Sequence, residues 1–223
     1  MFERIPRRNA DLVELLKAKG AFSSDRIKQV LLSVDRADFA RVSPYCDSPQ
    51  SIGYNATISA PYMHAQSLER LADVIKDESR ILDIGCGSGY LTTCFAEMIG
   101  PSGKVIGIDH ISELVALSER NIRKHHEEYL DSERIVLVTK DGRLGHAALG
   151  PYDAIHVGAA ASKIPEELIN QLARGGRMLI PVGTTEQQFL QIDKSENDKI
   201  TSKNLYGVIY VPLTSKDHQL NSR

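Results

Sequence analysis

The sequence predicts an α/β fold: a doubly wound, mostly parallel seven-stranded sheet of the Rossmann-like type, with an N-terminal helical cover and a C-terminal antiparallel hairpin. Three observations support this. Residues 80–90 (RILDIGCGSGY) read as an apolar strand, a turn with glycine at every second position, and the start of a helix. Two further apolar runs, 104–109 and 134–139, also lead to an acidic residue. Residues 188–194 and 205–213 flank a polar turn, as hairpin strands do.

The composition predicts one domain in a reducing compartment. A chain of 223 residues has the length of one domain, 1–223, which we divide into an N-terminal part with a long loop (1–64), a core (65–214) and a tail (215–223). A net charge of -2 gives no basic field to attract nucleic acid. The three cysteines form no C-x-x-C pair, and no apolar run approaches the ~20 residues of a membrane span. The charged residues 1–8 lead into no signal-type apolar segment. We therefore expect a cytosolic protein with neither nucleic acid nor membrane as a partner.

The first 45 residues are expected to be helical. Residues 11–19 are amphipathic and stop at Gly20, which favours a helix end. Ser23, Ser24 and Asp25 then offer an N-cap for a second helix over 26–34. Neither segment holds a chemical cluster, so we interpret both as a cover over one side of the sheet.

Residues 43–64 differ from what precedes them. Three prolines and many hydroxyl side chains predict a long irregular loop, and such loops inside compact domains are usually functional or disordered. The aromatic and aliphatic residues spread through it need something to pack on, which argues against disorder. We interpret this segment as a loop that contacts substrate or cofactor, followed by a helix over 65–75.

The spacing of the glycine turn decides between ligands. The dinucleotide fingerprint G-x-G-x-x-G would place a third glycine at position 90, but the residue there is Tyr90 and the last glycine is Gly89. An anion bound at a helix N-terminus would also be repelled by the nearby Asp83. S-adenosylmethionine carries an ammonium and a sulfonium group and no phosphate. Gly85 and Gly87 would let its amino-acid end approach the backbone, although a tight strand-to-helix turn without ligand remains an alternative.

The next two strands end in similar residues. Asp109 closes the strand 104–109, twenty residues after Gly89, where an acid can bind ribose hydroxyls. Its alternative role is an N-cap for the helix 112–126, but Ser112 with Glu113 could serve that purpose. Strand 134–139 leads to Asp141 and Gly142, which could accept from an adenine amino group and let the ring approach, or form a plain turn. Because the carboxyl ends of parallel strands share one crevice, three such endings together favour an adenosine-type methyl donor.

The rest of the chain completes the sheet. Residues 151–157 predict a fourth strand with a small-residue end at 158–161. A short helix over 165–172 leads to a fifth strand over 178–182. The hairpin follows, and the last ten residues are polar and expected to form a mobile tail.

Other catalytic chemistries find little support. The seven histidines contain no H-E-x-x-H, which disfavours a metal, and there is no G-x-S-x-G. His156 lies within an apolar strand and is more simply a core histidine. Cys86 stands near a helix N-terminus, which could lower the pKa of its thiol, but it is more simply a small residue filling the turn. As acceptor of the methyl group, a carboxylate fits this sequence better. Because a carboxylate is already nucleophilic at neutral pH, the site needs only to orient it, which Thr57 and Ser59 could do.

Several of these segments together resemble one family. They are Tyr45-x-Asp47-x-Pro49, Gly53-x-x-Ala56-Thr57-Ile58-Ser59-Ala60-Pro61-x-Met63-His64, the turn 83–89, Gly107-Ile-Asp109-His110, 152–161 and Val211-Pro-Leu-Thr214. The sequence resembles protein-L-isoaspartate (D-aspartate) O-methyltransferase in its animal form, over about residues 8–215. The stretch 56–61 is the most specific of these segments, whereas the glycine turn alone is not.

The resemblance implies an activity and a site. The family transfers a methyl group from S-adenosylmethionine to the free α-carboxylate of L-isoaspartyl residues in damaged proteins and peptides. The ester then collapses to a succinimide whose hydrolysis restores some aspartate. By position, Ser59 is the implied active-site residue, and the family's usual state implies a cytosolic monomer. The resemblance and the motifs described above together give the expected cofactor-binding residues: Ala56, Thr57, Ile58, Ser59, His64, Asp83, Gly85, Gly87, Gly89, Asp109, His110, Asp141, Gly142 and Thr214. Two alternatives stay open: a binding module without chemistry, and an NAD-dependent oxidoreductase, which Tyr90 opposes.

Overall fold

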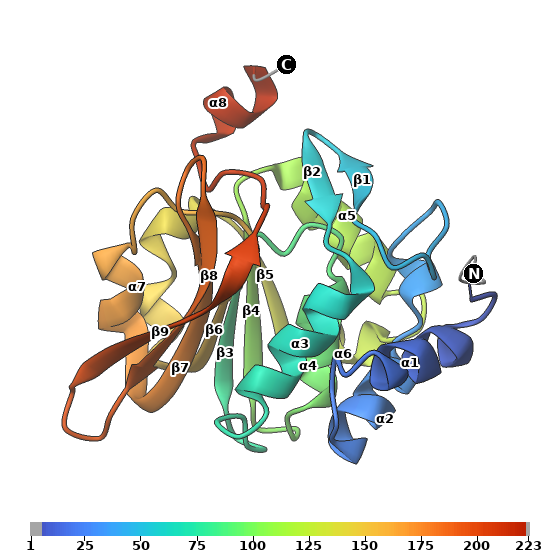
Figure 1. Ribbon diagram of the computed structural model, residues 1–223, viewed down its shortest axis with the longest axis horizontal. Helices are drawn as coiled ribbons and strands as arrows, with labels where there is room; N and C mark the ends of the chain where they lie inside the picture. Colours follow the sequence, from blue (N-terminus) through green and yellow to red (C-terminus); the bar gives the residue numbers. More distant parts are fainter. Residues whose placement is uncertain (1–5, 222–223) are drawn as a thin grey trace.

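The fold is built on a seven-stranded sheet whose strands follow the order β5-β4-β3-β6-β7-β8-β9 in a computed structural model that describes residues 6–221 (Figure 1). Strands β3 to β7 are parallel, and β8 and β9 form the antiparallel hairpin at one edge. The strands are β3 (Arg80–Ile84), β4 (Lys104–Asp109), β5 (Ile135–Thr139), β6 (Tyr152–Val157), β7 (Leu172–Val182), β8 (Gln187–Lys194) and β9 (Ile200–Val208). The predicted fold class is confirmed.

Alternating side chains give the sheet two apolar faces. Ile81 and Val105 point into one core cluster with the N-terminal helices and α4, whereas Leu82 and Ile106 point into a second cluster with α7. This two-residue period in doubly covered strands explains their nearly unbroken apolar runs. The helices are α1 (Asn9–Ala18), α2 (Asp25–Ser33), α3 (Pro61–Leu71), α4 (Tyr90–Glu97), α5 (Ser112–Ile122), α6 (Glu127–Asp131), α7 (Glu166–Gln171) and α8 (Lys216–Asn221), with one-turn 3₁₀ helices at Arg36–Asp38, Gly142–Leu144 and Ala147–Leu149.

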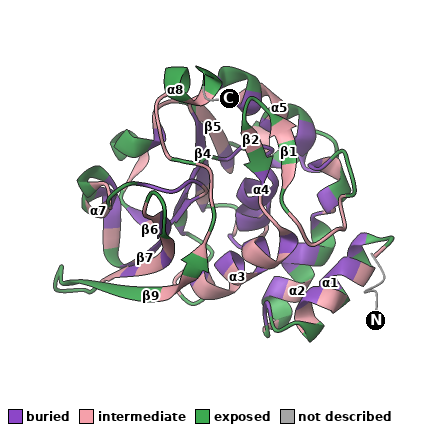
Figure 2. Ribbon diagram, turned by 45° about the horizontal axis from the view of Figure 1, so that its top comes forward, coloured by how far each residue is buried: buried purple, intermediate pink, exposed green. Residues whose placement is uncertain are grey.

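Helix α4 is the most enclosed helix, with every residue from Tyr90 to Ala96 buried (Figure 2). It follows β3 directly, through the glycine turn. The chain then proceeds outward through β4 and β5 before it returns to place β6 on the other side of β3. This reversal of strand order between β3 and β6 is the switch point at which doubly wound sheets bind ligands. The predicted turn 85–89 therefore lies at the position where a ligand is expected.

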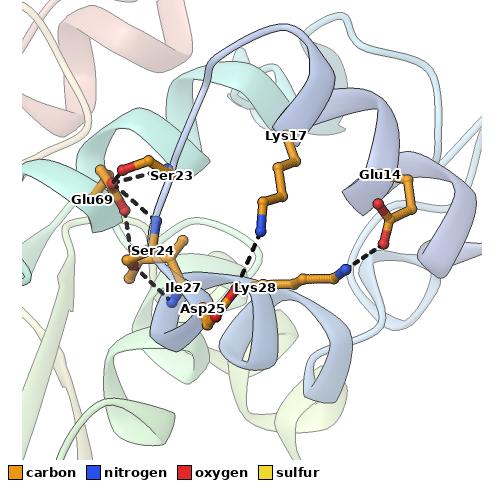
Figure 3. A network of polar contacts seen from close by, with 8 residues as sticks. All are labelled: Glu14, Lys17, Ser23, Ser24, Asp25, Ile27, Lys28 and Glu69. Carbon is orange, nitrogen blue, oxygen red and sulfur yellow. Dashed lines mark hydrogen bonds and ion pairs between the residues drawn. The ribbon is translucent and has the colours of Figure 1, made fainter.

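The N-terminal cover is joined to the core by a polar network around Glu69 of α3 (Figure 3). Its carboxylate accepts hydrogen bonds from the backbone N–H and the hydroxyl of both Ser23 and Ser24, over 2.6–3.2 Å. The Ser24 hydroxyl also accepts from the N–H of Ile27, so it is the N-cap of α2 that the sequence predicted. The ion pair of Lys17 with Asp25 links α1 to α2.

Several segments differ from the sequence-based expectation. The second hairpin strand spans Ile200–Val208 where 205–213 was expected, and the fifth strand begins at Leu172 where 178 was expected. The loop 43–64 contains a two-stranded hairpin, β1 (Gln50–Gly53) and β2 (Ala56–Ile58), because Tyr54 and Asn55 adopt the positive φ angles of a tight turn. Helix α5 ends at Ile122, and α6 follows separately where one helix to 126 was expected. The polar tail is not irregular throughout, since Lys216–Asn221 form α8, in which Ser215 accepts from the N–H of His218.

Candidate active site

The glycine turn is fixed to both neighbouring strands. The N–H of Gly85 donates to the carbonyl of Ile108 in β4 over 2.8 Å, and the N–H of Gly158, after β6, donates to Ile84 over 2.7 Å. Gly85, Gly87 and Gly89 all have positive φ, which explains glycine at every second position. A Cβ on Gly158 would lie 3.2 Å from the carbonyl oxygens of both Ile84 and Gly85. The small residue after the fourth strand thus allows the two strand ends to approach each other.

Two adjoining clefts open on this turn. The larger encloses about 520 Å³ of space, part of it open to solvent, and the smaller about 350 Å³. They share the walls formed by Thr57, Gly85, Gly87 and Gly158, so they are two ends of one site. Such a site suits an elongated ligand with two chemically different ends.

The larger cleft has both apolar and polar walls. Its apolar lining includes Ile84, Ile108 and Leu213, and its polar lining includes Asp109 and His110. Gly142 also lines it, and a Cβ there would lie 2.4 Å from Cγ2 of Ile84, so a larger residue would force Ile84 or the turn to move. Apolar walls beside a carboxylate fit a nucleoside, with the base against the apolar side chains and the ribose at the acid.

The carboxylate of Asp109 is already engaged by the protein. Oδ1 accepts from the N–H of Ile111 over 3.0 Å, and Oδ2 accepts from the N–H of Gly87 over 3.2 Å. Ser112, the alternative cap, instead donates its hydroxyl to Glu113. Burial raises the pKa of Asp109, and the hydrogen bonds from Ile111 and Gly87 oppose the rise. Asp109 therefore faces the cleft and holds the turn that leads into α5, but it is not the N-cap of that helix, which is Ile111.

The smaller cleft is polar and lies against buried ionisable groups. Its lining includes Ser59, His64, Asp83 and His156. Asp83 accepts from the hydroxyl of Thr92 in α4 over 2.6 Å and lies 2.9 Å from Nδ1 of His156. The sequence identified His156 as a satisfied core histidine, and this contact confirms that interpretation. A polar cleft beside a buried carboxylate can receive the charged amino-acid end of a ligand.

Cys86 is not an activated thiol. Burial raises its pKa well above the ordinary value, and the nearby carboxylates of Asp109 and Asp83 raise it further. This agrees with the favoured interpretation of Cys86 as a small residue that fills the turn, and not with the alternative in which the helix N-terminus lowers its pKa.

Ser59 lies where the hairpin rejoins the core. Its backbone carbonyl accepts from Nη2 of Arg36 over 2.6 Å, and its side chain interacts with Tyr210. Burial raises the pKa of Tyr210, and the hydrogen bond with Ser59 opposes that rise. Thr57 borders both clefts at the same place. The segment 56–59 thus crosses the mouth of the site between its two ends.

Helix α8 borders the larger cleft through Gln219 and was missed by sequence reasoning. Oε1 of Gln219 lies 2.8 Å from Nε2 of His110, and its Nε2 donates to the carbonyl of Tyr54 over 2.9 Å. Asn55 donates in return to the backbone carbonyl of Gln219 over 2.8 Å. Gln219 therefore joins the end of the chain to the β1–β2 turn across the site. The available signal was Ser215, an N-cap residue three positions before His218.

Of the predicted cofactor-binding residues, all except Gly89 and Asp141 line one of the two clefts. Gly89 instead begins α4, and a Cβ there would lie 3.1 Å from Cβ of Ser118, so its role is close helix packing. Asp141 directs its carboxylate to Arg143, whose hydrogen bonds lower the pKa of Asp141 against the effect of burial. Only its neighbour Gly142 reaches the cleft wall.

The fold and the site together define a Rossmann-like, S-adenosylmethionine-dependent methyltransferase. The larger cleft, in which a Cβ at Gly142 would force Ile84 or the turn to move, fits the adenosine end, and the smaller, polar cleft fits the amino-acid end. Tyr90 occupies the place of the third dinucleotide glycine and packs against His64, with ring centroids 5.1 Å apart. No group of metal-ligating side chains occurs within residues 6–221.

Comparisons with known proteins specify the family. The family model described as "Protein-L-isoaspartate(D-aspartate) O-methyltransferase (PCMT)" matches residues 7–218, and the chain belongs to this family. It is 51% identical over 215 residues to a protein-L-isoaspartate O-methyltransferase of Caenorhabditis elegans, covering 96% of this chain and 95% of the relative. A wheat (Triticum aestivum) relative of the same name is 49% identical over 96% of this chain and 94% of its own length.

A solved structure supports the same conclusion. A Plasmodium falciparum protein assigned as a protein-L-isoaspartate O-methyltransferase, crystallised with S-adenosyl-L-homocysteine, superposes with a TM-score of 0.88. It is 36% identical, and the match covers 94% of this chain and 99% of that one. The fold, the cofactor class and the family predicted from the sequence are thereby confirmed.

Proposed function

We propose that this protein transfers a methyl group from S-adenosylmethionine to the free α-carboxylate of L-isoaspartyl residues in damaged proteins and peptides, with D-aspartyl residues as a further substrate. The observation that carries the proposal is the position of the segment 56–59, which crosses the junction of the two clefts with Thr57 on both. The family membership supports it, because relatives of this name cover nearly the whole chain.

The residues divide between the two ends of the cofactor. Asp109, His110, Gly142 and Thr214 would hold the adenosine end, as they line the larger cleft. His64, Asp83, Gly85 and Gly87 would hold the amino-acid end, as they line the smaller one. When bound, S-adenosylmethionine supplies an electrophilic methyl group on a sulfonium centre.

The task of the protein is then to orient the acceptor and to exclude water. A carboxylate is already ionised at neutral pH, so no general base is needed. Ser59 and the neighbouring backbone would orient the acceptor, and Tyr210 beside Ser59 would support that side chain. Helix α8 and the β1–β2 turn cover the site and limit the access of water.

The experiment is a comparison of two peptides that differ only in the linkage of one residue. Incubation with methyl-labelled S-adenosylmethionine should release labelled methanol from the isoaspartyl peptide and not from the aspartyl peptide. Ser59→Ala should lower kcat/KM for the isoaspartyl peptide at least tenfold while the affinity for S-adenosylhomocysteine changes little. Binding of S-adenosylhomocysteine without methanol release would contradict the proposal and favour a module that only binds the cofactor.

The setting of the enzyme is part of the same proposal: a monomer in the cytosol that acts on proteins and peptides. The three free cysteines support a reducing compartment. Within residues 6–221, no helix has the length and apolarity to span a bilayer. Light scattering of the purified protein and fractionation of cells test these two points directly.

A further inference from the structure

Arg36 carries a charge that the protein buries without an acidic partner. It lies in the 3₁₀ helix Arg36–Asp38, after α2, and its relative exposure is 0%. Within residues 6–221, no carboxylate forms an ion pair with it. Its Nε is buried and has no hydrogen-bond partner. An arginine is almost never fully buried unless an acidic group pairs with it, since removing a charge from water is unfavourable.

The guanidinium faces the active site through three contacts. Nη2 donates to the carbonyl of Ser59 over 2.6 Å, and Nη1 lies 3.1 Å from Nδ1 of His64. Its Cζ lies 5.2 Å from the centroid of the Tyr90 ring, so the guanidinium and the ring form a cation–π interaction. Arg36 itself lines neither cleft, so it can act there only through the residues that it contacts, Ser59, His64 and Tyr90, all of which line the smaller cleft.

The contact with His64 determines the tautomer of that histidine. A guanidinium has only donors and keeps its proton in proteins, so Nδ1 of His64 must accept. The proton of the neutral ring therefore resides on Nε2. Burial lowers the pKa of His64 well below its ordinary value, and the charge of Arg36 and the nearness of His156 lower it further. His64 thus stays neutral and offers an Nε2–H donor.

Groups from several elements surround His64 in addition to Arg36. Tyr90 of α4 packs on its ring, and Asp83 of β3 and His156 of β6 line the same cleft, as do Ser59 and the Cys86 thiol. The Asp83 carboxylate is engaged by Thr92 and His156. Since Nδ1 of His64 faces Arg36, no nearby acid accepts a proton from that nitrogen. Asp47 attracts the guanidinium of Arg36 without forming an ion pair with it, so this guanidinium is the buried positive charge on this side of the cleft.

We propose that Arg36 is a positioning residue that fixes His64 as a neutral Nε2–H donor and holds the backbone of Ser59, so that a ligand carboxylate in the smaller cleft is received by a donor with a buried positive charge behind it. The inference rests on the proposed function for the identity of that ligand. Two carboxylates could occupy the cleft, that of the cofactor's amino-acid end and that of the acceptor. The buried charge would favour either one for the same physical reason.

The first test needs no variant. Long-range ¹H–¹⁵N spectra of the ¹⁵N-histidine-labelled protein should show His64 as the Nε2–H tautomer, unchanged between about pH 5.5 and 8. A His64 ring that carries its proton on Nδ1, or that titrates in this range, would overturn the proposal. Because the spectra require no catalysis, they remain informative even if the isoaspartyl peptide is not methylated.

The second test removes the charge. Arg36→Met should remove the preference of His64 for the Nε2–H tautomer, because Nδ1 then has no donor to accept from, and should weaken binding of S-adenosylhomocysteine or raise KM for the isoaspartyl peptide at least tenfold. A weaker affinity for S-adenosylhomocysteine would indicate that the cleft receives the carboxylate of the cofactor. A raised KM for the peptide with unchanged cofactor affinity would indicate that it receives the carboxylate of the acceptor. Arg36→Lys keeps the charge and should restore part of the affinity without restoring both contacts. A folded Arg36→Met protein with unchanged His64 spectra, affinity and KM would overturn the proposal.

A matched control separates a positioning role from a loss of packing. Arg26 also donates to three backbone carbonyls, those of Ala72, Ile75 and Met98, and its side chain lines neither cleft of the site. Arg26→Met should lower stability and leave the His64 tautomer unchanged. If Arg36→Met does not fold, the wild-type spectra still report the tautomer of His64. Arg36→Lys then tests the contacts, because the ammonium group of a lysine keeps the charge but cannot bind Ser59 and His64 with the two-pronged geometry of the guanidinium.

Discussion

Oδ1 of Asp83 lies 2.9 Å from Nδ1 of His156, and the two residues are register partners on the adjacent strands β3 and β6. The second oxygen of Asp83 accepts from the hydroxyl of Thr92 in α4. The acid that the sequence placed before the glycine turn therefore joins three elements at the switch point of the sheet. It supports the turn as well as lining the cleft.

Asp83→Asn should destabilise the protein by about 2 kcal/mol, because an amide cannot accept from both Thr92 and His156 and leaves one buried donor unpaired. Thr92→Val is the matched comparison, since it removes only the hydroxyl donor and keeps the side-chain volume. We expect it to cost about 1 kcal/mol. Urea unfolding monitored by circular dichroism measures both. Equal stability of Asp83→Asn and the wild type would show that the pair is not important for folding.

Gly142→Ala should abolish most cofactor binding, because the added methyl would lie 2.4 Å from Cγ2 of Ile84 on the wall of the larger cleft. Either Ile84 or the 3₁₀ turn after β5 must move, and both form the proposed adenosine pocket. We expect the Kd for S-adenosylhomocysteine, measured by calorimetry, to rise at least tenfold.

Gly207→Ala is the control for this substitution. Its added Cβ would meet nothing closer than 3.9 Å, and Gly207 lies on neither cleft of the site. We expect its Kd to match that of the wild type. A Gly142→Ala protein with unchanged affinity would place the adenosine end elsewhere.

The sequence predicted the parallel core because its signals are local. Apolar runs, the glycine turn and the acid at each strand end lie within a few residues of each other, and the shared sheet edge then brings them together. It could not predict that Asp141 faces Arg143, or that Arg36 is buried beneath Ser59, since 23 positions separate those two residues. Contacts of side chains that are distant in sequence have no periodic signature. Gln219 was missed for the same reason.

Glu69→Gln should reveal a stabilisation that depends on pH. Burial opposes ionisation, but the hydrogen bonds from Ser23 and Ser24 lower the pKa of Glu69 below 4.5 in the folded protein. A depressed folded pKa means that the stabilisation is complete above pH 4.5 and is lost as the pH falls through the lower, folded value.

The wild type should therefore exceed Glu69→Gln in unfolding free energy by about 1 kcal/mol at pH 7, discounted for the partial exposure of the carboxylate. The difference should shrink as the pH falls below 4.5. Urea midpoints at about pH 7, 5 and 3.5 measure it. A difference that stays constant over this range would mean that the Glu69 charge does not contribute and that only side-chain geometry does.

Gln219→Ala should loosen α8 at the border of the larger cleft, because it removes the contact with His110 and the hydrogen bond to the carbonyl of Tyr54. Two neutral hydrogen bonds at about 1 kcal/mol each correspond to roughly a tenfold change or more in an equilibrium constant. We expect S-adenosylhomocysteine to dissociate faster, in stopped-flow displacement, by a factor of about ten. Leu220→Ala, on an exposed neighbour in the same helix, controls for a general weakening of α8 and should leave the rate unchanged. Equal rates in the wild type and Gln219→Ala would show that α8 covers the site without retaining the cofactor.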